Sequence, residues 1–311
     1  MKKILIIGSL NMDFAIHTAR IPAEGETVTG ETLSLIPGGK GANQAYTAGK
    51  LGAEVSMIGS IGNDIYGKKL LNNLKKANVK TSGIKIDTKE ETGKAFIAIN
   101  NTGENSIIVI PGANNALTCD WIDENEDKIN DCDIVVIQLE IPLKTVYHAI
   151  TTAKAKGKII ILDPAPAVKN FSQEIMAKID IIKPNETELS FLTDMPVNSE
   201  TDIKKAAQKL LNMGVNSVIT TFGSHGAYLI EKNTFHHFPA LKVKAIDSTA
   251  AGDSFTAAIA VSLTKSPNII QAVNFATKTA AIVVTRKGAQ SSIPSLNEVI
   301  NYKNNAFSIK K

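Results

Sequence analysis

Strand-like and helix-like segments alternate along most of this chain of 311 residues, and this rhythm limits the folds open to it. The apolar runs KILIIGS, DIVVIQLE and KIIILDP are continuous rather than alternating, which predicts strands buried on both faces. Between such runs lie segments of helical character, such as DIYGKKLLNNLKKAN and LKTVYHAITTAKAKG. This β-α-β-α order predicts an α/β fold with a mostly parallel sheet and helices on both of its faces.

Two regions break the rhythm. Residues 14–36 and 94–110 look like short alternating strands and hairpins without intervening helices. We interpret them as a small antiparallel flap inserted into one large domain that spans residues 1–311. The hydrophobic content of 43% is enough to build the core of such a domain.

Charge and cysteine content exclude several classes of protein. The net charge of +4 is spread over single lysines and short pairs, which disfavours a nucleic-acid partner. Cys119 and Cys132 show neither metal-ligand spacing nor a disulfide framework. The apolar N-terminal run stops at Asn11 and Asp13 with no cleavage site, and no run is long enough to span a bilayer. We therefore expect a cytoplasmic protein with no membrane partner.

Two segments look like nucleotide-binding motifs and fail on a chemical detail. GNDIYGKK, residues 62–69, fits G-x-x-x-x-G-K but has lysine where a P-loop needs Ser or Thr for magnesium. The first strand runs into GSLNMD rather than G-x-G-x-x-G. The sequence therefore disfavours both a P-loop and a dinucleotide-binding Rossmann site. Without the latter, a nicotinamide dehydrogenase is disfavoured as well.

PGGKGANQA, residues 37–45, is a more specific signal. Gly38, Gly39 and Gly41 allow a close backbone approach at a helix start, and Asn43 would face a ligand from the first turn. A plain helix-entry turn is the alternative, although such a turn usually needs one glycine rather than three.

Acids follow two of the predicted strands. NMD brings Asp13 just beyond the first strand, and QLE ends on Glu140. Ligands of open parallel sheets bind beyond the carboxyl ends of strands, where such acids can accept hydrogen bonds from sugar hydroxyls. Each acid alone could equally be a loop carboxylate or a helix cap, but together they outline a polar crevice.

Two further strand ends have balanced interpretations. In KPNETE, Asn185 and Glu188 form either a capping box or part of a magnesium–phosphate site. In TFGSHGA, residues 221–227, the glycines suit either a phosphate loop or a hairpin turn. His225 has no partner at ligand spacing and is interpreted as a surface residue.

DSTAAGDSF, residues 247–255, feeds a helix of small apolar residues. The amides of Ala250, Ala251, Gly252 and Asp253 would point out of the helix N-terminus and form an anion hole. Asp253 is either an ordinary first-turn acid or a general base beside that hole.

Taken in order, the motifs resemble those of the ribokinase-like, PfkB-type carbohydrate kinases. The resemblance runs from residue 8 to residue 294 through nine blocks: GSLNMDF, EGETVTG, GGKGANQA, QLEIPL, DPAPA, KPNETE, TFGSHGA, DSTAAGDSF and TRKGAQSSIP. It implies a three-layer α/β/α sandwich with a mostly parallel central sheet and a small antiparallel β lid, which often serves as a homodimer clasp. It also implies ATP, Mg²⁺ and transfer of the γ-phosphoryl group to a sugar hydroxyl.

The resemblance assigns roles residue by residue. Asp253 matches the base, and Ala250, Ala251 and Gly252 match the anion hole. Sugar contacts are implied for Asn11, Met12, Asp13, Gly39, Lys40, Gly41, Ala42, Asn43, Glu140 and Asp253. Nucleotide or magnesium–phosphate contacts are implied for Asn185, Glu188, Thr221, Phe222, Gly223, Ser224, His225, Gly226, Gly252, Asp253 and Thr277.

The resemblance also implies a monovalent cation, usually K⁺, beside the anion hole. Its matched contacts are Asp247, Thr249, Val283, Arg286, Gly288 and Ser292, most of them through backbone carbonyls. The basic pair Arg286–Lys287 could instead simply end a helix.

Two positions depart from the family pattern. Ala250 stands where glycine is frequent, and we expect little harm because alanine tolerates helical angles. Asp163 stands where asparagine is usual in the ribokinase branch, with an effect that the sequence leaves open.

The choice of sugar rests on Asn11. Its amide could hydrogen-bond a 2-hydroxyl, which favours D-ribose as the sugar. The resemblance implies that the phosphoryl group is then transferred to the C5 hydroxyl. TVYHAI, DMPV and QSSIPS also resemble the deoxyribokinases, so a deoxyribokinase is the first alternative. Fructokinase, 2-keto-3-deoxygluconate kinase and adenosine kinase follow, and a non-catalytic sugar sensor on the same fold is the alternative from another class.

Overall fold

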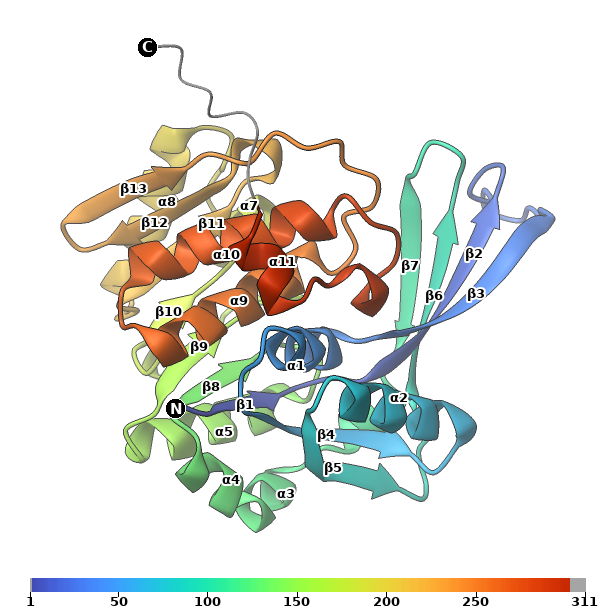
Figure 1. Ribbon diagram of the computed structural model, residues 1–311, viewed down its shortest axis with the longest axis horizontal. Coiled ribbons are helices and arrows are strands. Elements are labelled where there is room, and N and C mark those ends of the chain that lie inside the picture. The colour runs from blue at the N-terminus through green and yellow to red at the C-terminus, as the bar shows by residue number, and fades with distance from the viewer. Residues whose placement is uncertain (1, 303–311) are drawn as a thin grey trace.

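The computed structural model describes residues 2–302 and contains two sheets (Figure 1). The large sheet has the order β13-β12-β11-β10-β9-β8-β1-β4-β5 and is parallel from β11 to β5, with β12 and β13 antiparallel at one edge. Its strands are β1 (Ile4–Ile7), β4 (Val55–Gly62), β5 (Lys80–Asp87), β8 (Ile134–Ile137), β9 (Ile159–Leu162), β10 (Ile181–Ile182), β11 (Ser217–Thr221), β12 (Ala227–Glu231) and β13 (Thr234–Phe238). The predicted mostly parallel sheet is confirmed.

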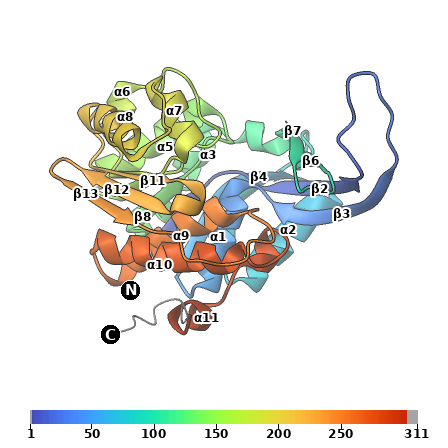
Figure 2. The same ribbon diagram turned by 90° about the horizontal axis from the view of Figure 1, so that it is seen from above.

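Helices cover both faces of this sheet, which makes three layers (Figure 2). One face carries α1 (Lys40–Lys50), α2 (Ile65–Lys76), α9 (Ala251–Lys265), α10 (Ile269–Val283) and α11 (Leu296–Ile300). The other carries α3 (Cys119–Glu124), α4 (Glu126–Asp131), α5 (Leu143–Ala155), α6 (Gln173–Met176), α7 (Glu186–Thr193) and α8 (Glu200–Asn212). Within residues 2–302, no helix has the length and apolarity needed to cross a membrane.

The central strand β1 shows why its sequence is apolar throughout. Ile4 and Ile6 lie in the core beneath α1, α9 and α10, whereas Leu5 and Ile7 lie in the core on the opposite face. All four side chains are fully buried. A strand covered on both faces has no position left for a polar side chain.

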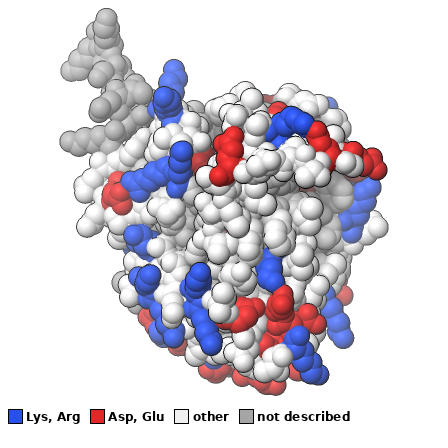
Figure 3. Space-filling model, turned by 90° about the vertical axis from the view of Figure 1, so that its right-hand side faces the viewer, with Lys and Arg blue, Asp and Glu red and all other residues white. Residues whose placement is uncertain are grey.

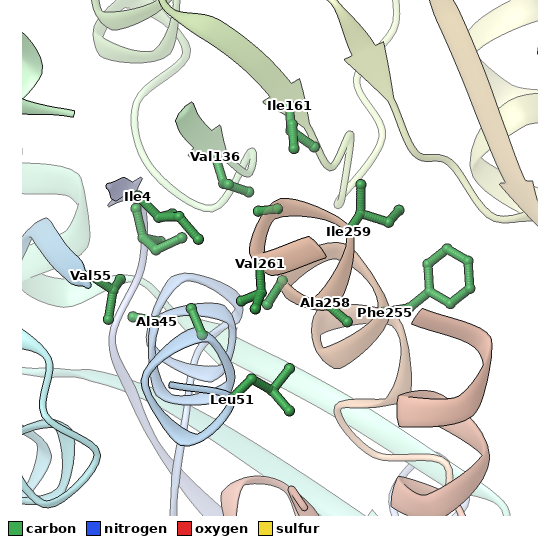
Figure 4. Packing of buried hydrophobic residues seen from close by; sticks show 14 of the residues in the cluster. Ile4, Ala45, Leu51, Val55, Val136, Ile161, Phe255, Ala258, Ile259 and Val261 are labelled. Carbon is green, nitrogen blue, oxygen red and sulfur yellow. The ribbon is translucent and has the colours of Figure 1, made fainter. Parts of the chain in front are cut away.

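Small side chains let α9 pack closely against its neighbour α1. Ala45 of α1 and Leu51, which directly follows α1, lie in the same core as Ala258 and Val261 of α9 (Figure 4). This packing holds the first turn of α9 at a set place above the sheet.

A second sheet, here called the lid, extends beyond the β4–β5 side of the molecule (Figure 1). Its order is β3-β2-β6-β7, with β2 (Asn11–Thr18), β3 (Gly30–Gly38), β6 (Gly93–Ile99) and β7 (Asn105–Ile110). The pairs β2–β3 and β6–β7 are antiparallel, as predicted for the two irregular regions. The pairs meet through β2 and β6, which run parallel to each other.

Candidate active site

Segments far apart in the sequence meet in a cleft at the carboxyl ends of the large sheet's parallel strands. The cleft has a volume of about 910 Å³. The predicted site residues that line it are Lys40, Asn185, Glu188, Thr221, Gly223, Ser224, Gly226, Ala250, Ala251, Gly252, Asp253 and Thr277. The position agrees with the rule that open α/β sheets bind ligands beyond the carboxyl ends of their strands.

Asp253 lies in the first turn of α9 at the centre of this arrangement. Its side chain is 8% exposed, and its Oδ2 accepts a hydrogen bond of 2.9 Å from Asn43 Nδ2. Gln44 Nε2 donates to Oδ1 at 3.3 Å. Burial raises the pKa of Asp253, and the Lys40 ammonium opposes this rise. The result is a fixed carboxyl group with an increased proton affinity.

The amides around Asp253 are partly free. The first helical bond of α9 runs from Ser254 N to Ala250 O, and Ala251 N donates to Ser248 O at 3.1 Å. Within residues 2–302, the amides of Gly252 and Asp253 have no backbone partner, as is usual in the first turn of a helix. The helix N-terminus therefore offers N–H groups to an anion beside the carboxyl group.

The expectation for Ala250 is wrong. This residue has φ 59° and ψ 8°, which is the left-handed region rather than the right-handed helical one. An L-residue with a Cβ is strained there by about 1–2 kcal/mol, and glycine is not. The turn that precedes α9 requires this conformation, and the alanine adopts it at a cost.

The carboxyl groups of Asp13, Glu140 and Asp253 lie near one another beside Lys40, and of the three only Asp253 lines the cleft. Glu140 Oε2 accepts from the Ser9 hydroxyl at 2.5 Å and from Lys40 N at 3.1 Å. Burial, Glu140 and Asp253 together raise the pKa of Asp13 to about 7. Burial lowers the pKa of Lys40, but the carboxylates of Asp253 and Glu140 raise it more, so the net shift is upward.

The glycines at the start of α1 lie close to the protein's own backbone after β1. A Cβ on Gly39 would lie 2.6 Å from Asn11 N, and one on Gly41 would lie 2.6 Å from Ser9 N. Gly39 also has φ 87°. These glycines thus let α1 begin directly against the segment that follows β1.

Other predicted sugar contacts differ in their surroundings. Met12 and Ala42 are 1% exposed and pack in the core. Asn11 Oδ1 accepts from Asn114 Nδ2 at 2.8 Å. Asn43 binds Asp253 through Nδ2 and accepts from Gln290 Nε2 through Oδ1 at 3.0 Å, so both ends of its amide have partners within the chain.

At the far end of the cleft, the capping box and the hairpin turn predicted as alternatives are both present, and residues of both also line the cleft. Asn185 and Glu188 form the capping box of α7, with bonds of 2.7 and 2.8 Å, yet both line the cleft. Burial raises the pKa of Glu188. Thr221 pairs with Asn185 through an isolated parallel bridge, and the glycine loop that follows is a hairpin turn between β11 and β12.

The side chains of Phe222 and His225 stack on each other, with ring centroids 4.8 Å apart, and do not line the cleft. The hydroxyl of Thr277, on α10, donates to Val273 O at 2.9 Å.

The fold and the grouping of these motifs agree with a family comparison. The family model described as pfkB family carbohydrate kinase matches residues 1–296. The chain belongs to the pfkB family of carbohydrate kinases.

Several relatives of this kinase match over nearly their whole length. A ribokinase of Staphylococcus aureus is 40% identical over 299 residues, which cover 96% of this chain and 98% of the relative. A deoxyribokinase of Salmonella typhi is 38% identical over 299 residues with the same coverage. The solved structure of Arabidopsis thaliana ribokinase complexed with ribose and ATP is 32% identical, covers 97% of this chain and 99% of that one, and has a TM-score of 0.91.

The loop that precedes α9 in this kinase holds a tightly bonded carboxylate. Asp247 Oδ1 accepts from the amide and hydroxyl of Thr249 at 2.9 and 2.6 Å, and Oδ2 accepts from Gly288 N at 2.8 Å. Burial opposes ionisation of Asp247, but these bonds outweigh it and lower the pKa. Nearby, Val283 O accepts from Arg286 N, and the Arg286 guanidinium lies 3.5 Å from Ser292 O.

Several residues of the site were not singled out from the sequence. Gln44 links Asp253 to Gln138, and Asn114 holds Asn11 in place. Lys183 lines the cleft and pairs with Asp163. Gln44 and Lys183 lie inside the blocks GGKGANQA and KPNETE, which carry the family resemblance. The sequence therefore indicated these segments as part of the site but not these two residues.

Proposed function

We propose that this kinase transfers the γ-phosphoryl group of ATP to the C5 hydroxyl of D-ribose and releases D-ribose 5-phosphate and ADP. One observation carries the proposal. The Asp253 carboxyl group is buried at the N-terminus of α9, with the acids Asp13 and Glu140 near it on one side and the glycine-lined cleft on the other. A sugar beside the acids and a nucleotide in the cleft would place the two reacting groups against the same residue.

The chemistry follows from that position. Asp253 accepts the proton of the sugar hydroxyl as its oxygen attacks the γ-phosphorus, and the bond to the ADP oxygen breaks. The amides of Gly252 and Asp253 donate to the phosphoryl oxygens, where negative charge must be held. The raised pKa of Asp253 suits a base that has to bind a proton.

The group of acids around Asp253 suits a polyhydroxylated ligand. Asp13 and Glu140 accept hydrogen bonds from sugar hydroxyls when they are ionised. Asn11 Oδ1 is taken by Asn114, which leaves the Asn11 amide nitrogen for the 2-hydroxyl. A 2-deoxy sugar would leave that buried donor unpaired, and this favours ribose.

The residues of the far end fit Mg²⁺ and a polyphosphate. Glu188 uses Oε2 in its capping box and keeps Oε1 for a magnesium-bound water. Asn185, Thr221, Gly223, Ser224 and Gly226 surround the phosphates, and Thr277 lies at the nucleobase. Mg²⁺ neutralises charge on the phosphates when it is bound.

The loop around Asp247 fits a monovalent cation. A carboxylate has about four acceptor positions, and the bonds from Thr249 and Gly288 take three of them. The remaining position and nearby carbonyl oxygens could hold K⁺, which would order the turn that precedes α9.

The lid supports a homodimer. Register places Leu33, Leu35, Ile108 and Ile110 on one face of the lid, and these side chains are 61%, 41%, 67% and 49% exposed. Much of the middle of the molecule's lid side is free of charged side chains (Figure 3). A second copy of the chain would cover this apolar face.

An assay of ATP consumption tests the sugar assignment. The candidates are ribose, 2-deoxyribose, fructose, 2-keto-3-deoxygluconate and adenosine, each with and without K⁺, and phosphorus NMR of the product gives the position of the phosphate. We expect ribose with K⁺ to be the best pair and the product to carry its phosphate on C5.

A preference for 2-deoxyribose would replace the proposal by a deoxyribokinase, the activity named for the Salmonella typhi relative. Equal rates with and without K⁺ would remove the cation role of Asp247. Binding of sugar with no consumption of ATP by any pair would support a sensor instead.

A further inference from the structure

A buried ion pair joins the ends of two neighbouring strands of the large sheet. Asp163 follows β9 and Lys183 follows β10, and their side chains are 2% and 4% exposed. The strands pair in parallel, and the bond from Lys183 N to Leu162 O continues that pairing, which sets the two residues side by side. Lys183 Nζ lies 3.2 Å from Asp163 Oδ1. The carboxylate offsets the free-energy cost of placing an ammonium group inside the protein.

The ammonium group of this pair reaches the proposed anion hole. Lys183 Nζ lies 3.5 Å from the position that a Cβ on Gly252 would take. It lines the cleft, and its charge opposes the burial-driven rise in the pKa of both Glu188 and Asp253. Lys183 therefore places a positive charge between the proposed magnesium–phosphate residue and the proposed base.

Asp163 and Lys183 differ in how many of their hydrogen-bonding positions are already used within the protein. Asp163 Oδ2 accepts from Gln44 Nε2 at 2.9 Å and from the Thr256 hydroxyl at 3.1 Å, which fixes the carboxylate. Lys183 has three N–H donors, and within residues 2–302 its ammonium contacts Asp163 but donates no well-aligned hydrogen bond. A fixed anion thus holds a cation whose donors remain available to a ligand in the cleft.

We propose that Lys183 binds the terminal phosphate of the nucleotide and that Asp163 is the residue that positions it. The inference rests on the proposed phosphoryl transfer and adds a residue to it. In the proposed transfer the Gly252 amide donates to the terminal phosphate, and Lys183 is adjacent to Gly252. The pair also accounts for an acid at position 163, because an asparagine there would leave the buried ammonium without a counter-charge.

The test measures nucleotide binding in the absence of sugar. Lys183→Met alone would leave Asp163 as an unpaired buried anion, so the main variant is Asp163→Asn/Lys183→Met, which removes both charges together. The matched control is Glu174→Gln/Lys178→Met, which neutralises a surface pair at 2.7 Å. Calorimetry gives the Kd of a non-hydrolysable ATP analogue, ADP and AMP, each with Mg²⁺.

In the main variant we expect the Kd of the ATP analogue to rise about tenfold or more and the Kd of AMP to rise by less than about twofold. With ribose and ATP, kcat should fall about 10²-fold, since one donor to a developing charge is lost. The control variant should match the wild type in every measurement. An equal loss of affinity for AMP and for the ATP analogue, or no loss of affinity for either, would overturn the role of Lys183.

A second variant covers the case in which the double variant does not fold. Lys183→Arg keeps the charge and the pairing with Asp163, so its affinity for AMP should match that of the wild type. Its ATP-analogue affinity and kcat should fall, since a guanidinium presents its donors in a different geometry. Wild-type values in this variant would count against a specific phosphate contact.

Binding data separate this proposal from the proposed function. A chain that binds ATP through Lys183 but does not phosphorylate ribose would keep the phosphate contact and lose the sugar assignment. A wild-type chain that binds no nucleotide would overturn both.

Discussion

The strands β1 and β7 are both rich in isoleucine and have opposite surroundings. β1 reads ILII and is fully buried, whereas β7 reads NSIIVI and is exposed at all six positions. β1 has paired strands on both sides and helices on both faces, while β7 is the edge of the lid. An apolar strand therefore indicates that its side chains will pack against another surface. The topology decides whether that surface belongs to the same chain or to another one.

The two sheets also contribute differently to the cleft. Asp253 and Glu140 come from the body built on the large sheet, whereas Asp13 comes from lid strand β2. The body thus carries the proposed base, and the lid adds an acid beside it. The comparison predicts large effects on catalysis and folding from the body, and effects on association and sugar binding from the lid.

The largest effect should come from Asp253→Asn in the body. The amide keeps its size but cannot accept the proton, so kcat should fall about 10³-fold or more while the Kd values for ATP and ribose change little. Steady-state kinetics with calorimetry of both ligands would check this. Turnover close to that of the wild type would show that Asp253 is not the base.

Truncation of an isoleucine in each sheet tests the contrast in burial directly. Ile6→Ala in β1 should lower the free energy of unfolding by about 2–5 kcal/mol, because a cavity opens in a packed core. Ile108→Ala in β7 should cost less than about 0.5 kcal/mol in the monomer, since the side chain is 67% exposed. Urea unfolding of both variants gives the two values, and equal losses would break the comparison.

A charge on the lid face tests whether a second copy covers it. Ile108→Glu should weaken a homodimer about 10²-fold, because a carboxylate would be buried in an apolar interface. Ile300→Glu, on α11 and 61% exposed, is the matched control in the body. Light scattering after size exclusion should show monomers for the first variant only. A wild-type chain that is monomeric at high concentration would exclude the clasp.

The pH dependence of sugar binding should report the acid of the lid. The pKa of Asp13 is raised to about 7, so its ionised, accepting form is present above that pH and is lost below it. The KM for ribose should therefore rise about tenfold between about pH 8 and about pH 6. In Asp13→Asn this rise should disappear and KM should be high throughout. A rise that persists in the variant would assign the titration to another group.

The smallest effect concerns backbone strain in the body. Ala250→Gly should raise the free energy of unfolding by about 1 kcal/mol, since glycine adopts φ 59° without a Cβ clash. Ala251→Gly, at the first residue of α9, is the control and should lower it by up to about 1 kcal/mol, because glycine has a lower helix propensity than alanine. Thermal unfolding of the two variants should therefore shift in opposite directions.

Much of the fold follows from periodicity. Continuous apolar runs predicted buried parallel strands, and β1 and β8 to β10 confirm them. The loss of that rhythm predicted the two hairpins that form the lid. The prediction did not include the parallel pairing of β2 with β6, because strands that are distant in sequence carry no local signal of their relative direction.

The sequence by itself determined which segments become strands and helices and which blocks carry chemistry, because both depend on neighbouring residues. Only the tertiary structure decided the left-handed turn at Ala250, the exposure of Ile108 and the pairing of Lys183 with Asp163 and of Gln44 with Asp253. Gln44 and Asp253 are 209 positions apart in sequence. A contact of this kind arises when strand order and helix packing bring two elements together, and no local pattern records it.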